Sequence, residues 1–467
     1  MGLRLDWEIE AESTVVRDRG EDPNAARRRR AARFRLLLTV GLVALLVGGA
    51  AGAVIYRWNQ VNQQIEQLLR DTVAAEVTAL RIGDWNSFVR IQRSATDDWV
   101  NQQRLRFDDY QRLLETNPTA QLTGHILDVT IDGQRARVQV QEILDGVAYA
   151  RTWFYWRYEA DYDDDGEIDG WRRVPLDPTF WGSAATYEGE AVQVSYREVD
   201  TALATAMGSR VDEWMSIACS ALTCDSVPTV QIDIRSEGVT GIGWAPDDPW
   251  RLQLLSPHTD RARIDMPFEP GLQIQASSLL AERLITHVRG SWAVDETADA
   301  AFLRDSVKNW LIGRFIQVDP QTHLITSLVE HYDETSLGLL VRTLPADSSI
   351  DVLSVVTGRS LDQAGLDWRD FFNWRLSLER QLIAQQNSER FLALYDTRDE
   401  VVRGLASARF DAAPPDESMT VIHTEQMPPA EDGTPQRAAI TRIGEGEAQR
   451  EAQIVFRLVN GVWLRAS

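Results

Sequence analysis

The segment LLLTVGLVALLVGGAAGAVIY, Leu36–Tyr56, carries no charged residue and separates a basic N-terminal tail from the bulk of the chain. At about 1.5 Å per residue, a helix of this length spans roughly 30 Å, the thickness of the hydrocarbon core of a bilayer. Six arginines precede it within residues 27–35, whereas only Arg57 follows it closely. This asymmetry predicts a single-pass membrane protein with residues 1–35 in the cytoplasm and everything after Arg57 outside.

Two alternatives to a permanent anchor arise from the same end of the chain. Ala51-Gly52-Ala53 fits a signal-peptide cleavage site, although the 35 residues before the apolar segment exceed the usual n-region. Met1-Gly2 starts like a myristoylation site, but Asp6 stands where that motif needs serine or threonine. We therefore favour an uncleaved transmembrane helix and leave cleavage open.

Composition limits the partners of the remaining chain. The net charge is −22 overall and +2 for residues 1–35, which leaves −24 for the rest. A surface this acidic repels nucleic acid and anionic lipid headgroups. Lys308 is the only lysine, so nearly all positive charge is arginine. We interpret this as codon bias of a GC-rich, bacterial genome.

Periodicity predicts an α+β multidomain architecture. Apolar residues spaced three or four apart continue the membrane helix without a linker as far as Gly83-Asp84, and a second helix is expected over Asn86–Glu115. Strand-like runs follow at 125–131, 136–143, 150–160 and 170–174, with a hairpin turn at Asp132-Gly133. Residues 377–410 repeat the helical part on a smaller scale, and strands are expected at 419–426, 437–443 and 452–466.

Both α+β segments end alike, in DGWRRVP at 169–175 and VFRLVNGVWLRAS at 455–467. Segments 57–186 and 379–467 thereby resemble the nuclear-transport-factor-2-like (ketosteroid-isomerase-like) cone fold. The resemblance implies helices packed on a curved sheet that encloses a cavity. The candidates to line such cavities are His125, His423, Trp153, Trp156 and Trp171.

The middle of the chain follows another pattern. Strand EAVQVSY leads into a helix over 198–222 and strands at 229–235 and 251–256, and helices dominate from Gln275 to Arg375. The order of SSLLAERLITHV, NWLIGRF, SLVEHYDETSLGLLVRTL and SLDQAGLDWRDFFNWRL resembles the peptidase MA-like (gluzincin) family over residues 187–378. That family uses a zinc-binding helix with His-Glu-x-x-His and a glutamate from a following W-L-x-E-G helix.

The zinc chemistry of that family is missing here. The five motif positions read Arg283-Leu284-Ile285-Thr286-His287, and the third ligand falls on Gly313. One ligand of three cannot hold catalytic zinc, and Leu284 cannot act as a base. His287 is then a relic, and His323 and His331 are not expected to share a site with it. The hypothesis is a pseudoenzyme without zinc.

Two further motifs bear on metals and redox state. Asp161, Asp163, Asp165, Glu167 and Asp169 match the front of a calcium loop, but Arg172 replaces the bidentate glutamate, so Ca²⁺ and a solvated hairpin tip both remain open. Cys219 and Cys224 have no second Cys/His pair for zinc. In an oxidising compartment they favour a local disulfide.

The sequence thus predicts a membrane-anchored, extracytoplasmic pseudo-peptidase that serves as a non-catalytic binding or scaffold protein of the bacterial envelope. Its expected partners are the bilayer, through Leu36–Tyr56, and an envelope protein; no cofactor is expected unless the acidic loop binds Ca²⁺. The alternatives are a divergent zinc metallopeptidase and a small-molecule-binding cone domain.

Overall fold

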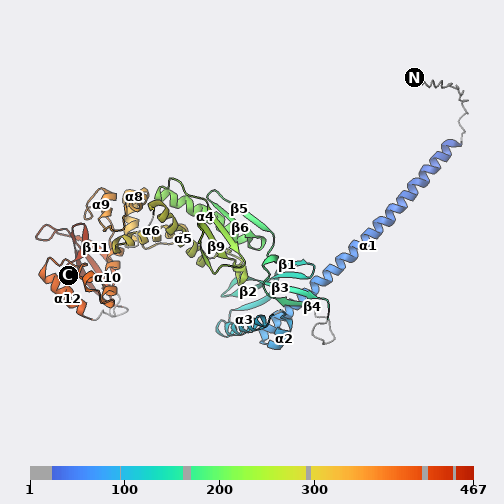
Figure 1. Cartoon of the computed structure of the whole chain (residues 1–467), viewed down its shortest axis with the longest axis horizontal. Coiled ribbons are helices and arrows are strands. Elements are labelled where there is room, and N and C mark those ends of the chain that lie inside the picture. The colour runs from blue at the N-terminus through green and yellow to red at the C-terminus, as the bar shows by residue number, and fades with distance from the viewer. Residues whose placement is uncertain (1–23, 95, 161–169, 291–295, 413–418, 445–448) are drawn as a thin grey trace, which may run out of the picture.

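The protein is described by a computed structural model that covers residues 24–94, 96–160, 170–290, 296–412, 419–444 and 449–467 of the 467-residue chain. It has the predicted mixed α+β architecture, with three separate sheets. The molecule is elongated: helix α1 (Ala25–Ile82) projects from one end and the C-terminus lies at the other (Figure 1).

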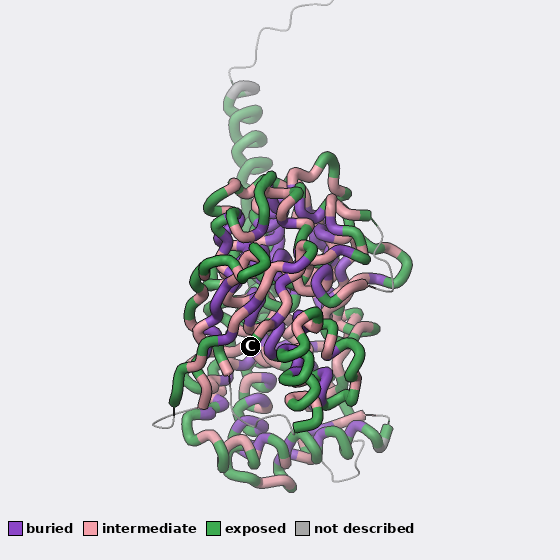
Figure 2. Tube along the Cα trace, turned by 90° about the vertical axis from the view of Figure 1, so that its left-hand side faces the viewer, coloured by how far each residue is buried: buried purple, intermediate pink, exposed green. Residues whose placement is uncertain are grey.

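Helix α1 is continuous through the predicted span and into the first folded part, which confirms that no linker separates them. It is long and apolar enough to cross a membrane, with a mean hydropathy of 2.3 in its most apolar window. Among the described residues, none covers the segment 36–56, and the helix is exposed where it projects from the fold (Figure 2). It ends at the predicted place, because Gly83 adopts φ 73° and Asp84 caps the next helix at the Ser87 N–H.

The second predicted helix is wrong in one respect, because the structure divides it into α2 (Trp85–Ile91) and α3 (Asp97–Thr116). The break occurs where Gln92 turns extended, with ψ 133°, and forms a bridge with Arg173. The Arg93 N–H then donates to the Arg173 carbonyl at 2.8 Å. A backbone contact with a distant strand therefore outweighs local helix propensity here.

The first sheet is antiparallel and contains the four predicted strands. These are β1 (Gln121–Asp132), β2 (Arg135–Leu144), β3 (Val147–Tyr158) and β4 (Gly170–Val174). The hairpin at Asp132-Gly133 is confirmed, and a second, unpredicted one turns at Asp145-Gly146 with φ 50° and 78°. Helices α1–α3 pack on this sheet around one apolar core.

A strand from the middle of the chain extends this sheet. Strand β10 (Ala262–Arg263) pairs with β3, with Ala262 opposite Ala150. Nothing in so short a run of residues predicts a strand. The pairing of β10 with β3 joins residues on either side of the domain boundary expected at residue 186. The domain boundaries stay a prediction.

The second sheet has the order β5-β6-β7-β9-β8 and is parallel at its centre. Helix α4 (Thr201–Leu222) connects the parallel strands β6 and β7 and buries a stripe that runs from Leu203 to Leu222. Strands β5 and β8 were not predicted. The strand bounds are β5 (Ala184–Glu188), β6 (Val192–Arg197), β7 (Val230–Arg235), β8 (Ile242–Ala245) and β9 (Asp248–Leu255).

The predicted helical region follows the second sheet. Its helices are α5 (Pro270–Arg289), α6 (Ala298–Ile316), α7 (His323–Tyr332), α8 (Thr335–Thr343), α9 (Val352–Thr357) and α10 (Arg369–Ala384). They share one apolar core with α4 and with the inner faces of β6, β7 and β9. Short 3₁₀ turns lie at Pro178–Phe180, Glu198–Asp200 and Pro257–Thr259.

The C-terminal part is a four-stranded antiparallel sheet preceded by two short helices. These elements are α11 (Ser388–Leu392), α12 (Glu400–Asp411), β11 (Met419–Met427), β12 (Gln436–Ile443), β13 (Arg450–Val459) and β14 (Val462–Arg465). The sheet packs directly on α10, where Phe456 stacks on Phe372 at 4.1 Å and Trp463 meets Trp368 at 5.7 Å. Its core is continuous with that of the middle helices.

Candidate functional site

The histidine of the peptidase-like helix α5 is bonded to backbone. His287 Nε2 donates to the Ser226 carbonyl at 2.7 Å, and its ring meets the edge of Trp250 at 5.3 Å between centroids. The side chain is exposed, and its Nε2 is occupied by this hydrogen bond. His323 and His331 lie on α7 and line a different groove.

The first two positions of the five-residue motif, Arg283 and Leu284, have structural roles. The Arg283 guanidinium lies over the Trp244 ring at 5.0 Å, a cation–π contact between α5 and β8. Leu284 is fully buried in the core of the helical region. A histidine ligand at position 283 would lose the cation–π contact of the guanidinium, and a general base at position 284 would be buried among apolar side chains.

Gly313, at the third ligand position, is packed too closely to carry a side chain. An added Cβ would lie 2.7 Å from both Pro320 Cβ and the Val318 carbonyl oxygen. Real Cβ atoms do not approach other atoms this closely, so the loop after α6 would have to move. The glycine is therefore required by packing, and a glutamate has no room here.

Substitution of Gly313 by alanine is expected to lower the free energy of unfolding by about 1–3 kcal/mol, because overpacking displaces the backbone of the loop. Urea unfolding followed by circular dichroism measures the change. Gly404→Ala is the matched control, since Gly404 is also helical and an added Cβ there meets nothing within 4 Å. If both variants unfold at the wild-type urea concentration, the packing argument for Gly313 fails.

The two cysteines lie together at the end of α4. Cys224 N–H donates to the Cys219 carbonyl at 3.2 Å, and a hydrogen bond from the Cys224 thiol lowers the pKa of Cys219. The structure holds both as free thiols. A disulfide between them stays a prediction.

The remaining predicted residues are spread over the first part of the chain. The calcium-loop residues Asp161, Asp163, Asp165, Glu167 and Asp169 lie outside the described residues. Three tryptophans and a histidine were proposed to line a cavity, and they differ in exposure. Trp153 and Trp171 are buried, Trp156 is partly exposed and His125 is exposed on β1; of these, Trp153 borders a cavity.

The structure brings three histidines together that the sequence did not associate. His323 and His331 of α7 and His423 of β11 line one groove of about 620 Å³, here called the histidine groove. The other polar residues that line it include Glu330, Asp367, Arg369 and Arg437. His331 Nδ1 donates to the Ser327 carbonyl at 2.8 Å, and Arg369 Nη2 donates to His323 Nδ1 at 3.2 Å.

These histidines and the charged side chains around them form a polar groove. Within the part of the chain that the structure describes, no three His, Cys, Asp or Glu residues are placed to hold a metal ion. The groove therefore offers hydrogen bonds to a polar ligand or partner, without a preformed metal centre. No sequence motif predicts the histidine groove, because α7 and β11 are about a hundred residues apart in the chain.

Asp370 lies beside this groove and links α10 to α7. Its carboxylate accepts hydrogen bonds from the Leu324 N–H at 3.1 and 3.2 Å, so it supports the N-terminus of α7. Burial raises the pKa of Asp370 to about 7, against the effect of these backbone hydrogen bonds. The folded protein thus holds a proton on this group that the unfolded chain, with a pKa of 3.8, has released.

Stability is expected to fall as the pH rises through this window, because the unfolded chain binds fewer protons than the folded protein between pH 4 and 7. From pH 5 to 7.5 the loss attributable to Asp370 is about 2–3 kcal/mol. Asp370→Asn keeps an acceptor for the Leu324 N–H and removes the titration, so its urea midpoint should change less with pH. Equal pH dependence of the variant and the wild type would contradict the assignment.

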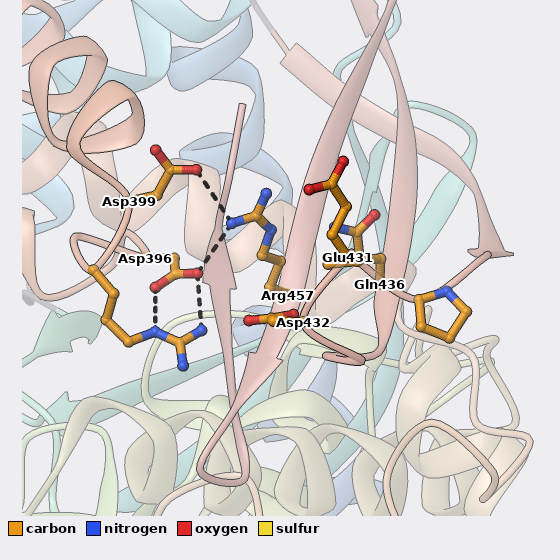
Figure 3. Close-up of a pocket in the computed structure, with 9 residues that line it drawn as sticks. Asp396, Asp399, Glu431, Asp432, Gln436 and Arg457 are labelled. Carbon is orange, nitrogen blue, oxygen red and sulfur yellow. Dashed lines mark hydrogen bonds and ion pairs between the residues drawn. The ribbon is translucent and has the colours of Figure 1, made fainter.

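A second groove, of about 700 Å³, opens on the C-terminal part (Figure 3). Asp396 is buried and is held by Arg398 at 2.7 Å and Arg457 at 3.4 Å, while Arg457 also reaches Asp399 at 3.4 Å. The side chain of Arg398 lowers the pKa of Asp396. Because these acidic and basic side chains form ion pairs with one another, they hold each other in place and give the groove a charged lining.

The sequence matches no protein-family model, and neither the curated proteins nor the solved structures gave a match. The likeness to the peptidase MA-like and nuclear-transport-factor-2-like families therefore rests on the sequence patterns alone. Both assignments stay predictions.

Proposed function

We propose that this protein is a membrane-anchored, non-catalytic binding or scaffold protein of the bacterial cell envelope, with its folded part outside the cytoplasm. The non-catalytic part of the proposal is supported by the residues at the three predicted zinc-motif positions, each of which has a packing role. Arg283 stacks on Trp244, Leu284 fills the core and Gly313 touches Pro320. Catalytic zinc needs three protein ligands and an open position, and none of these residues supplies a ligand.

The anchoring part is supported by helix α1. Its uncharged segment 36–56 has the length of a bilayer core and exposes apolar side chains on every face. The Trp171 indole N–H donates to the Ile65 carbonyl at 3.1 Å, which fixes the first sheet to the helix soon after the span. This arrangement holds the first sheet close to the membrane surface, whereas the two polar grooves lie toward the opposite end of the molecule, where a partner could reach them (Figure 1).

The non-catalytic part is tested by metal analysis and digestion. The full chain, purified in a non-ionic detergent without chelators, is expected to contain no stoichiometric zinc and to cleave no member of a peptide library. His287→Ala serves as the matched variant. Stoichiometric zinc in the wild type that is lost in His287→Ala would overturn the proposal in favour of a divergent zinc metallopeptidase.

The orientation is tested with reporter fusions in a bacterial host. Alkaline phosphatase folds only outside the cytoplasm, so a fusion after Ser467 is expected to be active, whereas a fusion after Arg35 is expected to be inactive. The reverse pattern would overturn the topology. Release of the C-terminal fusion from the membrane fraction would show that the segment is cleaved as a signal peptide.

A second candidate function, small-molecule binding by the first α+β part, is favoured by a separate observation. A cavity inside that part is bordered by three arginines and by Trp153. Its chemistry indicates the class of ligand.

A further inference from the structure

A small cavity lies between helices α1–α3 and strands β3 and β4. It has a volume of about 20 Å³, and we call it the arginine cavity. Its polar lining consists of Glu76, Gln103, Arg106, Tyr110, Arg151 and Arg173. A space of this size holds one water-sized group, so it suits a small ion or the end of a larger molecule.

The carboxylates near the arginine cavity are already bound. Glu76, which is 1% exposed, accepts hydrogen bonds from Arg173 Nη1 and from the Tyr155 hydroxyl, each at 2.7 Å. Glu142 is fully buried and accepts a hydrogen bond from Arg261 Nε. Glu76 thus pairs with one guanidinium, whereas Glu142 is within ion-pair distance of both Arg261 and Arg151, and its Oε1 has no hydrogen bond to a described residue.

Several donors of the arginine cavity have no such acceptor. Arg106, at the exposed mouth, has no hydrogen bond or ion pair to any residue that the structure describes. Arg151 approaches Glu142 only to 3.6 Å, and its Nε is buried without a hydrogen bond. The Gln103 side chain is 2% exposed, and its Nε2 also lacks a partner. A buried donor without an acceptor destabilises the fold, so an acceptor bound in the cavity would be stabilising.

The balance of charge around the arginine cavity also favours an anionic ligand. Arg106, Arg151, Arg173 and Arg261 face two buried carboxylates, and the further acid nearby, Asp260, is exposed and lies 3.9 Å from Arg261. Positive charge therefore exceeds negative charge around the cavity.

We propose that the arginine cavity binds a small anion, which accepts hydrogen bonds from Arg106, Arg151 and the Gln103 amide. Chloride and a carboxylate group share this chemistry. A carboxylate would place its oxygens inside, with the rest of its molecule passing Arg106 at the mouth. The proposal deepens the second candidate function and does not depend on the anchored, non-catalytic one.

The test is thermal unfolding of the full chain in a non-ionic detergent, titrated separately with sodium chloride and sodium acetate. Each titration is repeated at the same salt concentrations with the variants described below, so that a general effect of ionic strength is recognised by its persistence in them. We expect a saturable rise in unfolding temperature with chloride, with acetate or with both. The anion that acts identifies the source.

Three variants locate the effect. Arg106→Gln removes a guanidinium without an intramolecular partner, so it should fold normally and weaken the apparent affinity at least tenfold. Gln103→Leu removes the buried amide at similar volume and should also weaken binding. Arg112→Gln is the control, because Arg112 lies on the same helix and is 72% exposed. Saturable stabilisation that persists unchanged in Arg106→Gln, or none by either anion in the wild type, would overturn the proposal and leave water in the cavity. Neither result bears on zinc content or topology.

Discussion

Replacing Glu76 with alanine is expected to lower the free energy of unfolding by about 3–5 kcal/mol, because it leaves the Arg173 guanidinium buried without its carboxylate. Glu76 lies on α1, and the three groups that donate to it come from other elements. Arg173 and Tyr155 donate at 2.7 Å and Gln92 at 3.3 Å. The carboxylate thus joins helix α1 to the end of α2 and to two strands of the first sheet. Its loss removes acceptors for all three donors at once.

Urea unfolding of the full chain in non-ionic detergent measures this effect. Glu66→Ala is the matched control, since Glu66 lies on the same helix and forms an exposed pair with Arg70 at 2.6 Å. An exposed pair of this kind contributes less than about 1 kcal/mol. If the two variants lose equal stability, Glu76 is not the centre of a buried network.

The same variant bears on the arginine cavity. Without Glu76, Arg173 joins Arg106 as a guanidinium with no ion pair to a carboxylate among the described residues. A bound anion should then matter more, so added chloride or acetate is expected to restore part of the stability lost in Glu76→Ala. The wild-type response should be smaller.

The elements with a strong local pattern were predictable from the sequence. The uncharged segment 36–56 and the apolar spacing after it predict α1 up to Gly83, and alternation with a turn at Asp132-Gly133 predicts the first hairpin. The break between α2 and α3 was not predictable, because it depends on a hydrogen bond between Arg93 and Arg173, 80 residues further on. Strand β10 likewise exists only because β3 offers it an edge.

The candidate sites show the same division. That Arg283, Leu284 and Gly313 cannot supply zinc chemistry was readable from the sequence, because the motif compared has a fixed spacing. The tight packing of Gly313 on Pro320 was not, since it depends on the path of the following loop. The histidine groove and the arginine cavity have no sequence signature. The side chains of each site come from elements that are distant in the chain. A single arginine or histidine in the sequence does not indicate a site until the fold brings several of them together.

The second large effect on stability concerns the domain boundary predicted after residue 378. Phe456→Ala is expected to lower the free energy of unfolding by about 3–5 kcal/mol, because it removes a fully buried ring and leaves a cavity. Phe456 of β13 stacks on Phe372 of α10 at 4.1 Å, with 15° between the ring planes. The contact crosses the predicted limit, and both residues belong to the core shared with the middle helices.

The consequence for folding follows from that shared core. If the C-terminal sheet and the middle helices unfold together, Phe456→Ala will shift a single transition, seen alike in circular dichroism and in protease sensitivity of residues 270–376 and 419–465. Val401→Ala is the control, because Val401 is 72% exposed on α12. A loss under about 1 kcal/mol would contradict the burial argument. Cleavage confined to the C-terminal sheet, with the helices intact, would show an independent domain and favour the original limit. We expect the single transition, because α10 itself runs through residue 378 without interruption, from Arg369 to Ala384.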